Sequence, residues 1–183
     1  SIAAGDYSHT EGRGTSVYSR CNDGCHAEGY NTKVGDGTHD CDNGAHAEGY
    51  GTMVIADSAH AEGKDTIAGV VVGNETQGEA AHAEGNGSHA YGDYSHAEGK
   101  STEASGKGAH AEGKDTIASG SQAHAEGEDT TASGSQAHAE GDGTTASGRE
   151  SHAEGYGSHA YGFRSHTEGN NTTAEGWPTS LLF

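Results

Sequence analysis

The chain has 183 residues, of which 32 are Gly and only 30% are hydrophobic, so it lacks the large aliphatic residues of an ordinary globular core. Its 28 acidic residues against 9 Lys and Arg give a formal net charge of -19, which argues against nucleic acid and anionic membrane surfaces as partners. No apolar run reaches the roughly 18 residues that a membrane-spanning helix needs, so we expect no membrane insertion of this segment.

A motif His-Ala-Glu-Gly or His-Thr-Glu-Gly recurs from one end of the chain to the other. It begins at 11 histidines, and from His82 onward every interval is 14 residues; the four earlier intervals are 17, 20, 14 and 22. A fixed period indicates a repeat architecture. Low hydrophobicity and high net charge would otherwise suggest a disordered chain, but a disordered chain needs no regular repeat, so we expect a folded one.

The 14-residue unit, for example 121–134, consists of two halves that each alternate small and variable residues before a Gly. A helix is excluded because Gly costs about 1 kcal/mol at each occurrence. Alternation predicts strands with Ala, Ser and Thr inward and with His and Glu outward in the first half. Gly and the two residues after it are expected to form each turn. Two strands and two turns make one coil, and 11 coils stacked about 4.8 Å apart would form an all-β parallel roll, or solenoid, roughly 50 Å long.

The first third of the chain departs from the strict repeat. Residues 1–5 are interpreted as a second-half strand, so that the chain starts within a coil. Val17, Val34 and Val54 occupy inward positions that Ala takes later, which predicts slightly wider coils here.

Three insertions enter after the second strand of their coils, near 20–24, 36–44 and 69–80. We expect them to protrude on one side of the rod, either as tolerated surface loops or as a binding surface.

The repeat domain is assigned to residues 1–176. Residues 177–183 begin with Trp177-Pro178 and end with Leu181, Leu182 and Phe183, so they are expected to form an apolar cap or the start of a following segment. Since the chain begins within a coil and stops abruptly, we expect it to be part of a longer protein.

The outward residues of the first half are the same in every copy, whereas those of the second half vary freely. A column of 11 stacked Glu would repel itself, as would protonated His, unless a second surface of the same kind compensated it. We therefore interpret this surface, the His/Glu face, as an interface between chains around a three-fold axis; pairing within one chain on an exposed face is the alternative. The His/Glu face comprises His9, Glu11, His26, Glu28, His46, Glu48, His60, Glu62, His82, Glu84, His96, Glu98, His110, Glu112, His124, Glu126, His138, Glu140, His152, Glu154, His166 and Glu168.

Metal binding on this face is a further alternative, because imidazole and carboxylate are ligands of Zn, Ni and Fe. The uniform spacing favours a hydrogen-bonded His/Glu ladder instead, so no metal or other cofactor is expected. If His gains a Glu partner on assembly, its folded pKa would rise above about 6.5. Stability from that pairing would then be lost as pH rises through the folded pKa.

The three cysteines lie in the irregular part of the chain. Cys21 and Cys41 each precede their motif histidine by five residues on adjacent coils, which would place equivalent Cα atoms about 5 Å apart, within disulfide range. We predict a Cys21–Cys41 disulfide; a small Zn site with Cys21, Cys41 and His39 is the alternative. Cys25 occupies an inward position and is expected to be a buried thiol.

Two near-copies, 87–94 and 157–164, place aromatic residues on the otherwise polar second half. Such residues suit contacts with carbohydrate or protein, although incidental surface decoration explains them equally well. The possible ligand contacts are His89, Tyr91, Tyr94, His159, Tyr161 and Phe163.

An enzyme is not expected from this sequence. It contains no nucleophile elbow, no phosphate-binding Gly loop and no single carboxylate pair. Catalysis needs one asymmetric cleft, and a regular rod provides none.

The tandem pattern Ser-x-Ala-x-Gly-x-x-Thr-x-Ala-x-Gly, which covers residues 1–176, resembles the head repeats of YadA-like trimeric autotransporter adhesins. The Ser-His-Ala-Glu-Gly arrays also resemble shaft segments of phage tail fibres. This resemblance implies a left-handed β-roll, three chains per rod, and an extracellular location on a virion fibre or a cell surface. In that family the outward positions of the first half are typically apolar and pack at the trimer centre, whereas here they are His and Glu.

The sequence therefore predicts a homotrimeric structural module of a phage or virus fibre, which presents loops to a host receptor, either glycan or protein. A bacterial adhesin head is the first alternative. A monomeric solenoid that binds ions or ice is the alternative of another class, although the second-half surface lacks the Thr-x-Thr rows that ice binding favours.

Overall fold

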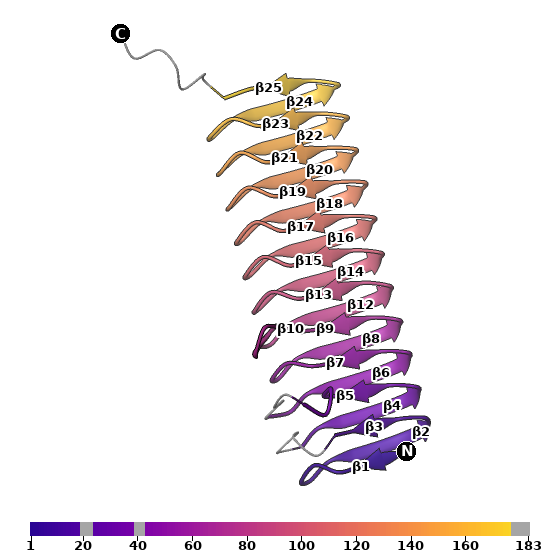
Figure 1. Ribbon diagram of the computed structural model, residues 1–183. Coiled ribbons are helices and arrows are strands. Elements are labelled where there is room, and N and C mark those ends of the chain that lie inside the picture. Colours follow the sequence, from indigo (N-terminus) through magenta and orange to yellow (C-terminus); the bar gives the residue numbers. More distant parts are fainter. Residues whose placement is uncertain (19–23, 39–42, 177–183) are drawn as a thin grey trace.

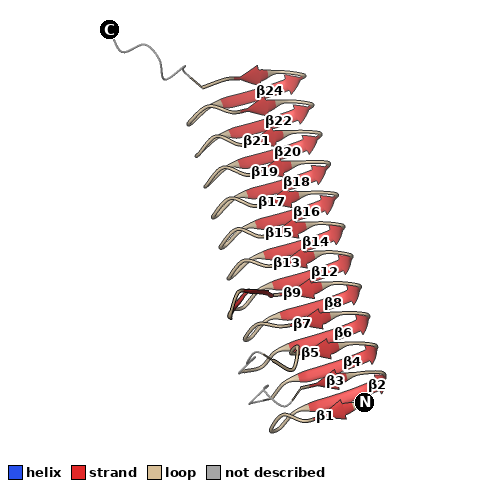
Figure 2. Cartoon of the chain, viewed as in Figure 1, coloured by secondary structure: helices blue, strands red, loops and turns tan. Residues whose placement is uncertain are grey.

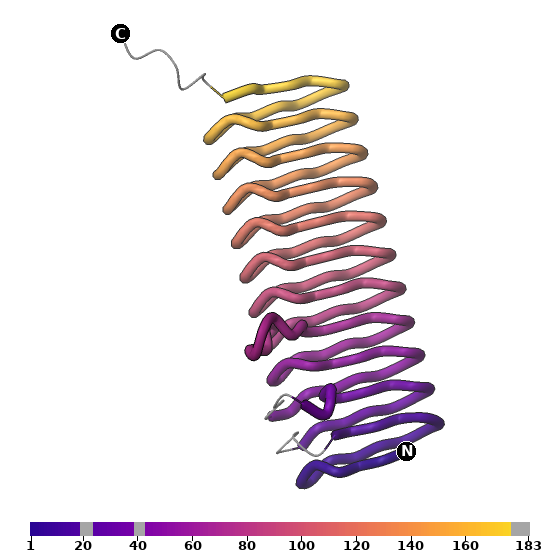
Figure 3. Tube along the Cα trace, viewed as in Figure 1, coloured from indigo at the N-terminus to yellow at the C-terminus, as the bar shows by residue number. Residues whose placement is uncertain are grey.

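The computed structural model describes residues 1–18, 24–38 and 43–176. These residues form a rod of stacked coils, and the described part contains strands and turns but no helix (Figures 1 and 2). Each regular coil takes 14 residues, so the all-β parallel solenoid predicted from the period is confirmed. The trace in Figure 3 shows that every coil has the same flattened outline, with a turn at either edge.

The first sheet contains the recurring His-Ala-Glu-Gly or His-Thr-Glu-Gly motif and has 11 parallel strands of five residues. Neighbouring strands pair in register, so that His96 lies opposite His110 and Glu98 opposite Glu112. The strands of this sheet are β2 (His9–Arg13), β4 (His26–Tyr30), β6 (His46–Tyr50), β8 (His60–Lys64), β12 (His82–Asn86), β14 (His96–Lys100), β16 (His110–Lys114), β18 (His124–Glu128), β20 (His138–Asp142), β22 (His152–Tyr156) and β24 (His166–Asn170).

The second sheet has 12 parallel strands of two residues, one from each coil. The expectation that the chain starts in this sheet is met, because Ile2 pairs with Ser16 of the next coil. Its strands are β1 (Ile2–Ala3), β3 (Ser16–Val17), β5 (Lys33–Val34), β7 (Met53–Val54), β9 (Ile67–Ala68), β13 (His89–Ala90), β15 (Glu103–Ala104), β17 (Ile117–Ala118), β19 (Thr131–Ala132), β21 (Thr145–Ala146), β23 (His159–Ala160) and β25 (Thr173–Ala174).

Both turns of the coil depend on a residue in the left-handed region of φ. In the turn after the first strand this residue is Asp115, Asp129 or Gly143 in successive coils, with φ of 55°, 54° and 65°. Asp, Asn and Gly adopt this conformation at low cost, which explains their frequency there. The sequence analysis placed both residues after the motif Gly in the turn. In the structure the first of them still belongs to the strand, and only the second turns.

The motif Gly itself is fixed by the stacking of backbones. Gly127 has φ of 116°, and a Cβ on it would lie 2.0 Å from the carbonyl oxygen of Gly141 in the next coil. In the second half Gly134 is equally close to the carbonyl oxygen of Gly148, although its own φ is unstrained. Any side chain at either position would therefore push two coils apart.

The core is a thin layer of small side chains between the two sheets. Ala125 of β18, Ala132 of β19 and Thr130, which immediately precedes β19, are fully buried, and so are their counterparts in the coils away from the two ends of the rod. Val17, Val34 and Val54 are also fully buried, which confirms their predicted inward positions. A coil of this width has no room for Leu or Phe, and this accounts for the composition.

The third insertion contains the only antiparallel pair in the described part of the chain. Strand β10 (Val70–Val72) pairs with β11 (Glu75–Gln77) to form a small hairpin between β9 and β12. The hairpin lies at the edge of the rod where the second turn of each coil is found (Figure 1). Much of the other two insertions lies outside the described residues.

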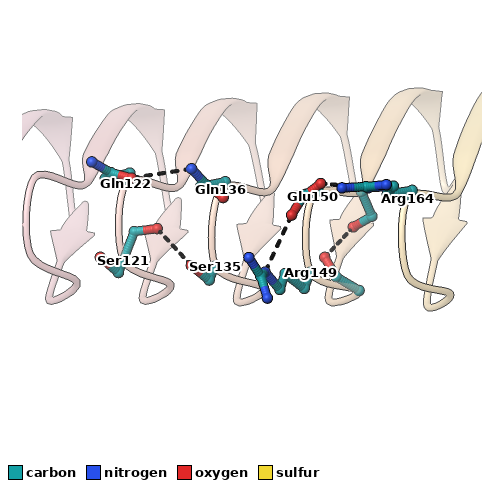
Figure 4. Close-up of polar contacts among 9 residues, drawn as sticks. Ser121, Gln122, Ser135, Gln136, Arg149, Glu150 and Arg164 are labelled. Atoms are coloured by element: carbon teal, nitrogen blue, oxygen red, sulfur yellow. Dashed lines mark hydrogen bonds and ion pairs between the residues drawn. The ribbon is translucent and has the colours of Figure 1, made fainter.

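Stacking also aligns the polar residues of the second turn into rows along the rod (Figure 4). Gln136 Nε2 donates to Gln122 Oε1 across 3.3 Å, and Arg164 Nε donates to Glu150 Oε2 across 2.6 Å. Both pairs join residues 14 positions apart, so each contact links equivalent positions of two neighbouring coils. These contacts are exposed and contribute little to stability.

Candidate functional site: the His/Glu face

The His/Glu face lies on the outer surface of the first sheet, where each strand contributes one His and one Glu on either side of a buried Ala. From His26 to His166, ten imidazoles stack in one column, with neighbouring centroids 4.7 to 4.9 Å apart and ring planes within 14° of parallel. His9 at the end of the rod meets His26 edge-on instead, at 69°. The in-register pairing of the strands produces this column, because it places equivalent side chains directly above one another.

Each His also lies beside the Glu two residues further along its own strand. The distance from His Nε2 to Glu Oε2 is 3.7 to 4.0 Å in the nine strands where it is defined. This is longer than a hydrogen bond. A single chain therefore does not form a hydrogen-bonded His/Glu ladder by itself, and a ladder between chains stays a prediction.

The Nε2 atoms of nine histidines are shielded from solvent and have no hydrogen-bond partner in the described part of the chain. A buried polar atom without a partner is costly, and it often marks a place where a group outside the chain binds. The nine are His26, His46, His60, His82, His96, His110, His124, His138 and His152.

The pKa values of six column histidines shift in the direction opposite to the one expected from Glu pairing; the six are His60, His96, His110, His124, His138 and His152. Desolvation by burial lowers the pKa of His110, His124 and His138, and the charge of the preceding imidazole lowers it further. The nearby Glu carboxylates raise it, but by less. In the single chain, burial and the neighbouring imidazoles therefore disfavour protonation of these three histidines; the effect of a Glu from another chain stays a prediction.

A third column borders the His/Glu face and was missed in the sequence analysis. It consists of the residue after the motif Gly, which the structure places at the end of each five-residue strand. Here Tyr30 stacks on Tyr50 with centroids 5.1 Å apart, Arg13 lies over the Tyr30 ring, and Lys114 forms an ion pair with Glu128. The sequence analysis assigned this residue to the turn, whereas the structure places it at the end of the strand. For this reason the column was not recognised from the sequence.

The predicted aromatic contacts divide between two parts of the coil. His89 and Tyr91 lie on either side of Ala90 on the second sheet, with ring centroids 5.3 Å apart, and His159 and Tyr161 repeat this arrangement at 5.7 Å. Tyr94 and Phe163 belong to the second turn, where each is exposed and lies beside a cation, Lys107 and Arg164 respectively. Whether these residues bind a ligand stays a prediction.

The two near-copies also have different surroundings. The hollow lined by Gly162, Phe163 and Glu175 corresponds, 70 residues earlier, to a hollow lined by Gly92, Asp93 and Ser105, which also includes the residues of β11. The 70-residue similarity of sequence therefore does not produce two equal sites.

Of the cysteines, only Cys25 lies within the described residues. Its side chain is buried in the core, as expected from its inward position. The predicted Cys21–Cys41 disulfide and the alternative Zn site with His39 fall on residues outside the described ranges.

Stacking brings metal ligands together along the His/Glu face. In the described part of the chain, three sets combine two successive His with the Glu of the first strand, each placing one ligand atom within 4.8 Å of the others: His26, Glu28 and His46; His46, Glu48 and His60; and His124, Glu126 and His138. A fourth set has one His and two Glu, namely Glu84, His96 and Glu98. The sequence showed ligand types at a uniform spacing. The structure adds that the donor atoms of neighbouring coils converge.

Comparison with known families supports the architecture. Residues 97–165 match the YadA head domain repeat in four overlapping segments, 97–123, 111–137, 125–151 and 139–165, so this part of the chain is similar to YadA head repeats. No curated protein matches the chain. In the described ranges, no helix has the length and apolar character needed to pass through a membrane.

Proposed function

We propose that the chain is one of three subunits of a rigid rod, joined along the His/Glu face, and that the rod is a structural attachment module on the surface of a virion fibre or a cell. The observation that carries this proposal is the unbroken His/Glu face, which runs along the whole first sheet while the second sheet varies. The YadA-like repeats of residues 97–165 support it, because head repeats of this kind belong to trimeric adhesins.

The physical argument concerns what a single chain leaves unsatisfied. Eleven carboxylates stand in register along one column, and the Nε2 atoms beside most of them have no hydrogen-bond partner among the residues that the structure describes. Neither feature is needed for coil stacking, which Ala, Thr and Gly already provide. Contact with the same face of other chains would supply partners for both columns at once.

A phage or virus fibre is the preferred setting, because the Ser-His-Ala-Glu-Gly arrays resemble fibre shafts; a bacterial adhesin head is the alternative. In either setting the hairpin β10–β11 and the exposed Tyr94 and Phe163 are the features that would contact a glycan or protein receptor. The constant face would then hold the rod together while the variable residues contact the host.

Light scattering after size-exclusion chromatography tests the proposal directly. The expected mass is about three times the 18.5 kDa of one chain. The double variant Glu112→Lys and Glu126→Lys on the His/Glu face should dissociate into monomers. The matched double variant Glu103→Lys and Thr131→Lys on the second sheet should remain trimeric. A stable monomer of the unaltered chain would overturn the proposal.

A further inference from the structure

We propose that the His/Glu face binds divalent transition-metal ions, with Zn²⁺ as the representative, in sites that each combine two stacked imidazoles with one carboxylate of the same chain. These sites need only one chain and so do not depend on trimerisation. They would nevertheless help it, because bound cations would offset the charge of the Glu column.

The distances between His Nε2 and Glu Oε2 suit an ion better than a hydrogen bond. With metal–nitrogen and metal–oxygen bonds of about 2.0 to 2.2 Å, a tetrahedral ion places two of its ligand atoms about 3.3 to 3.6 Å apart. The observed separations in nine strands are 3.7 to 4.0 Å. An ion would therefore need to draw the two atoms together by only a few tenths of an ångström.

The second imidazole comes from the next coil. In His124, Glu126 and His138 the three ligand atoms lie within 4.8 Å of one another, so a small rotation of one ring completes the set. Rotation about the terminal torsion of His is soft, which keeps the cost low. Water would supply the fourth position of a tetrahedral site.

The ligand set selects the class of ion. Two imidazole nitrogens and one carboxylate oxygen suit Zn²⁺, Ni²⁺ and Cu²⁺. Ca²⁺ and Mg²⁺ instead require six or more ligands that are all oxygen atoms. The shielded Nε2 atoms without hydrogen-bond partners are the second observation that points to a ligand at this place.

The stacking geometry also limits the number of ions. Nε2 has one lone pair, so a histidine serves a single ion, and the overlapping sets His26–Glu28–His46 and His46–Glu48–His60 cannot both be filled. The ten stacked histidines taken in pairs set an upper limit of five sites per chain. Two of these pairs, in His26–Glu28–His46 and His124–Glu126–His138, already have their ligand atoms within 4.8 Å of one another.

Two variants with equal numbers of His→Asn substitutions separate this proposal from non-specific binding to an acidic surface. The alternating variant changes every second stacked histidine and leaves no adjacent pair, whereas the block variant changes five consecutive ones and leaves five adjacent. Asn is chosen because stacked Asn side chains form ladders of their own. The alternating variant carries H26N, H60N, H96N, H124N and H152N; the block variant carries H110N, H124N, H138N, H152N and H166N.

Zn²⁺ is titrated into the metal-free full chain in competition with a chromophoric chelator. We expect up to five tightly bound ions in the unaltered chain, about two in the block variant and none in the alternating variant. H89N with H159N, which changes histidines outside the column, should leave the number unchanged. Equal binding by the block and alternating variants would overturn the proposal, since only the adjacency of histidines differs between them.

A second measurement uses the unaltered chain, in case the variants fail to fold. Electron paramagnetic resonance of bound Cu²⁺ should show hyperfine coupling to two imidazole nitrogens per ion, and coupling to one or none contradicts the proposal. Light scattering in EDTA distinguishes failure of the trimer proposal from failure of the metal-site proposal. A metal-free trimer that binds no Zn²⁺ would overturn only the metal sites, and a monomer that binds Zn²⁺ would overturn only the trimer.

Discussion

The two sheets of the rod share one interior but have different exteriors. Both point Ala or Thr inward, and both stack Gly on Gly between coils. On the outside, the first sheet repeats His and Glu in all 11 strands, whereas the second sheet has Glu103, Ile117, Thr131 and Thr145 at one equivalent position in successive coils. Coil stacking therefore determines the inward residues of both sheets. The proposed contact with other chains would explain why one exterior is constant while the other varies.

The largest expected effect tests the interior that the sheets share. Gly127→Ala in β18 would place a Cβ 2.0 Å from the carbonyl oxygen of Gly141 and would also strain a φ of 116°. Strain and overpacking together should cost about 3 kcal/mol or more. Gly134→Ala meets an equal clash without the strained φ, so it should cost less. Urea unfolding followed by circular dichroism measures both.

Gly143→Ala is the matched control for these glycine variants. It changes a turn Gly whose added Cβ would have no neighbour nearer than 3.9 Å, so only its φ of 65° is unfavourable. If it destabilised the chain as much as Gly127→Ala, close contact between coils would not be the reason for the motif Gly.

The second prediction separates the sheets by the width of their inward positions. Ala125→Val in the first sheet should cost about 1 to 3 kcal/mol through overpacking, and Ala132→Val in the second sheet less. Val17, Val34 and Val54 already occupy the second-sheet position. In the first sheet, β-branched residues take the equivalent position only at Thr10 and Thr167, in the outermost strands. If the two variants lowered the melting temperature equally, the inward positions of the two sheets would have equal room for a larger side chain.

Most of the fold could be predicted from the sequence because the period determines it. The alternation around Gly, the inward Val17 and Val54, and the strand at residues 1–5 all follow from side chains alternating between two faces. The direction of the His pKa shift could not be predicted in this way, because it depends on how deeply each imidazole is covered by its neighbours. The strand residue after the motif Gly, such as Lys114 or Tyr30, was missed because a positive φ at Gly was taken to begin the turn.

The third prediction concerns the pH dependence of the metal-free chain in EDTA. The folded pKa of His110, His124 and His138 is lowered below the unfolded value of about 6.5, so between the folded and unfolded values the unfolded chain binds more protons. Stability should therefore fall as pH drops through about 6.5. Differential scanning calorimetry should show a lower melting temperature at pH 5 than at pH 7.5. The difference should shrink when His110, His124, His138 and His152 are replaced by Asn.

The opposite slope would be equally informative. A melting temperature that fell as pH rose from 6 to 8 would mean that a Glu of another chain raises the pKa of the column histidines. The trimer contact would then be a charged pair rather than a neutral imidazole stack.

The smallest expected effect tests the exterior of the second sheet. Ile117 is 39% exposed, and its neighbour in register on the next strand is Thr131. Ile117→Thr should therefore change the free energy of unfolding by no more than about 0.5 kcal/mol, as is usual for surface substitutions, and should leave the assembly mass unchanged. His124→Thr also places Thr at an outward position, on the first sheet, but it removes the one ring that stacks on both His110 and His138. Only His124→Thr should weaken the assembly in light scattering, and equal effects of the two variants would mean that the constant face has no partner that the variable face lacks.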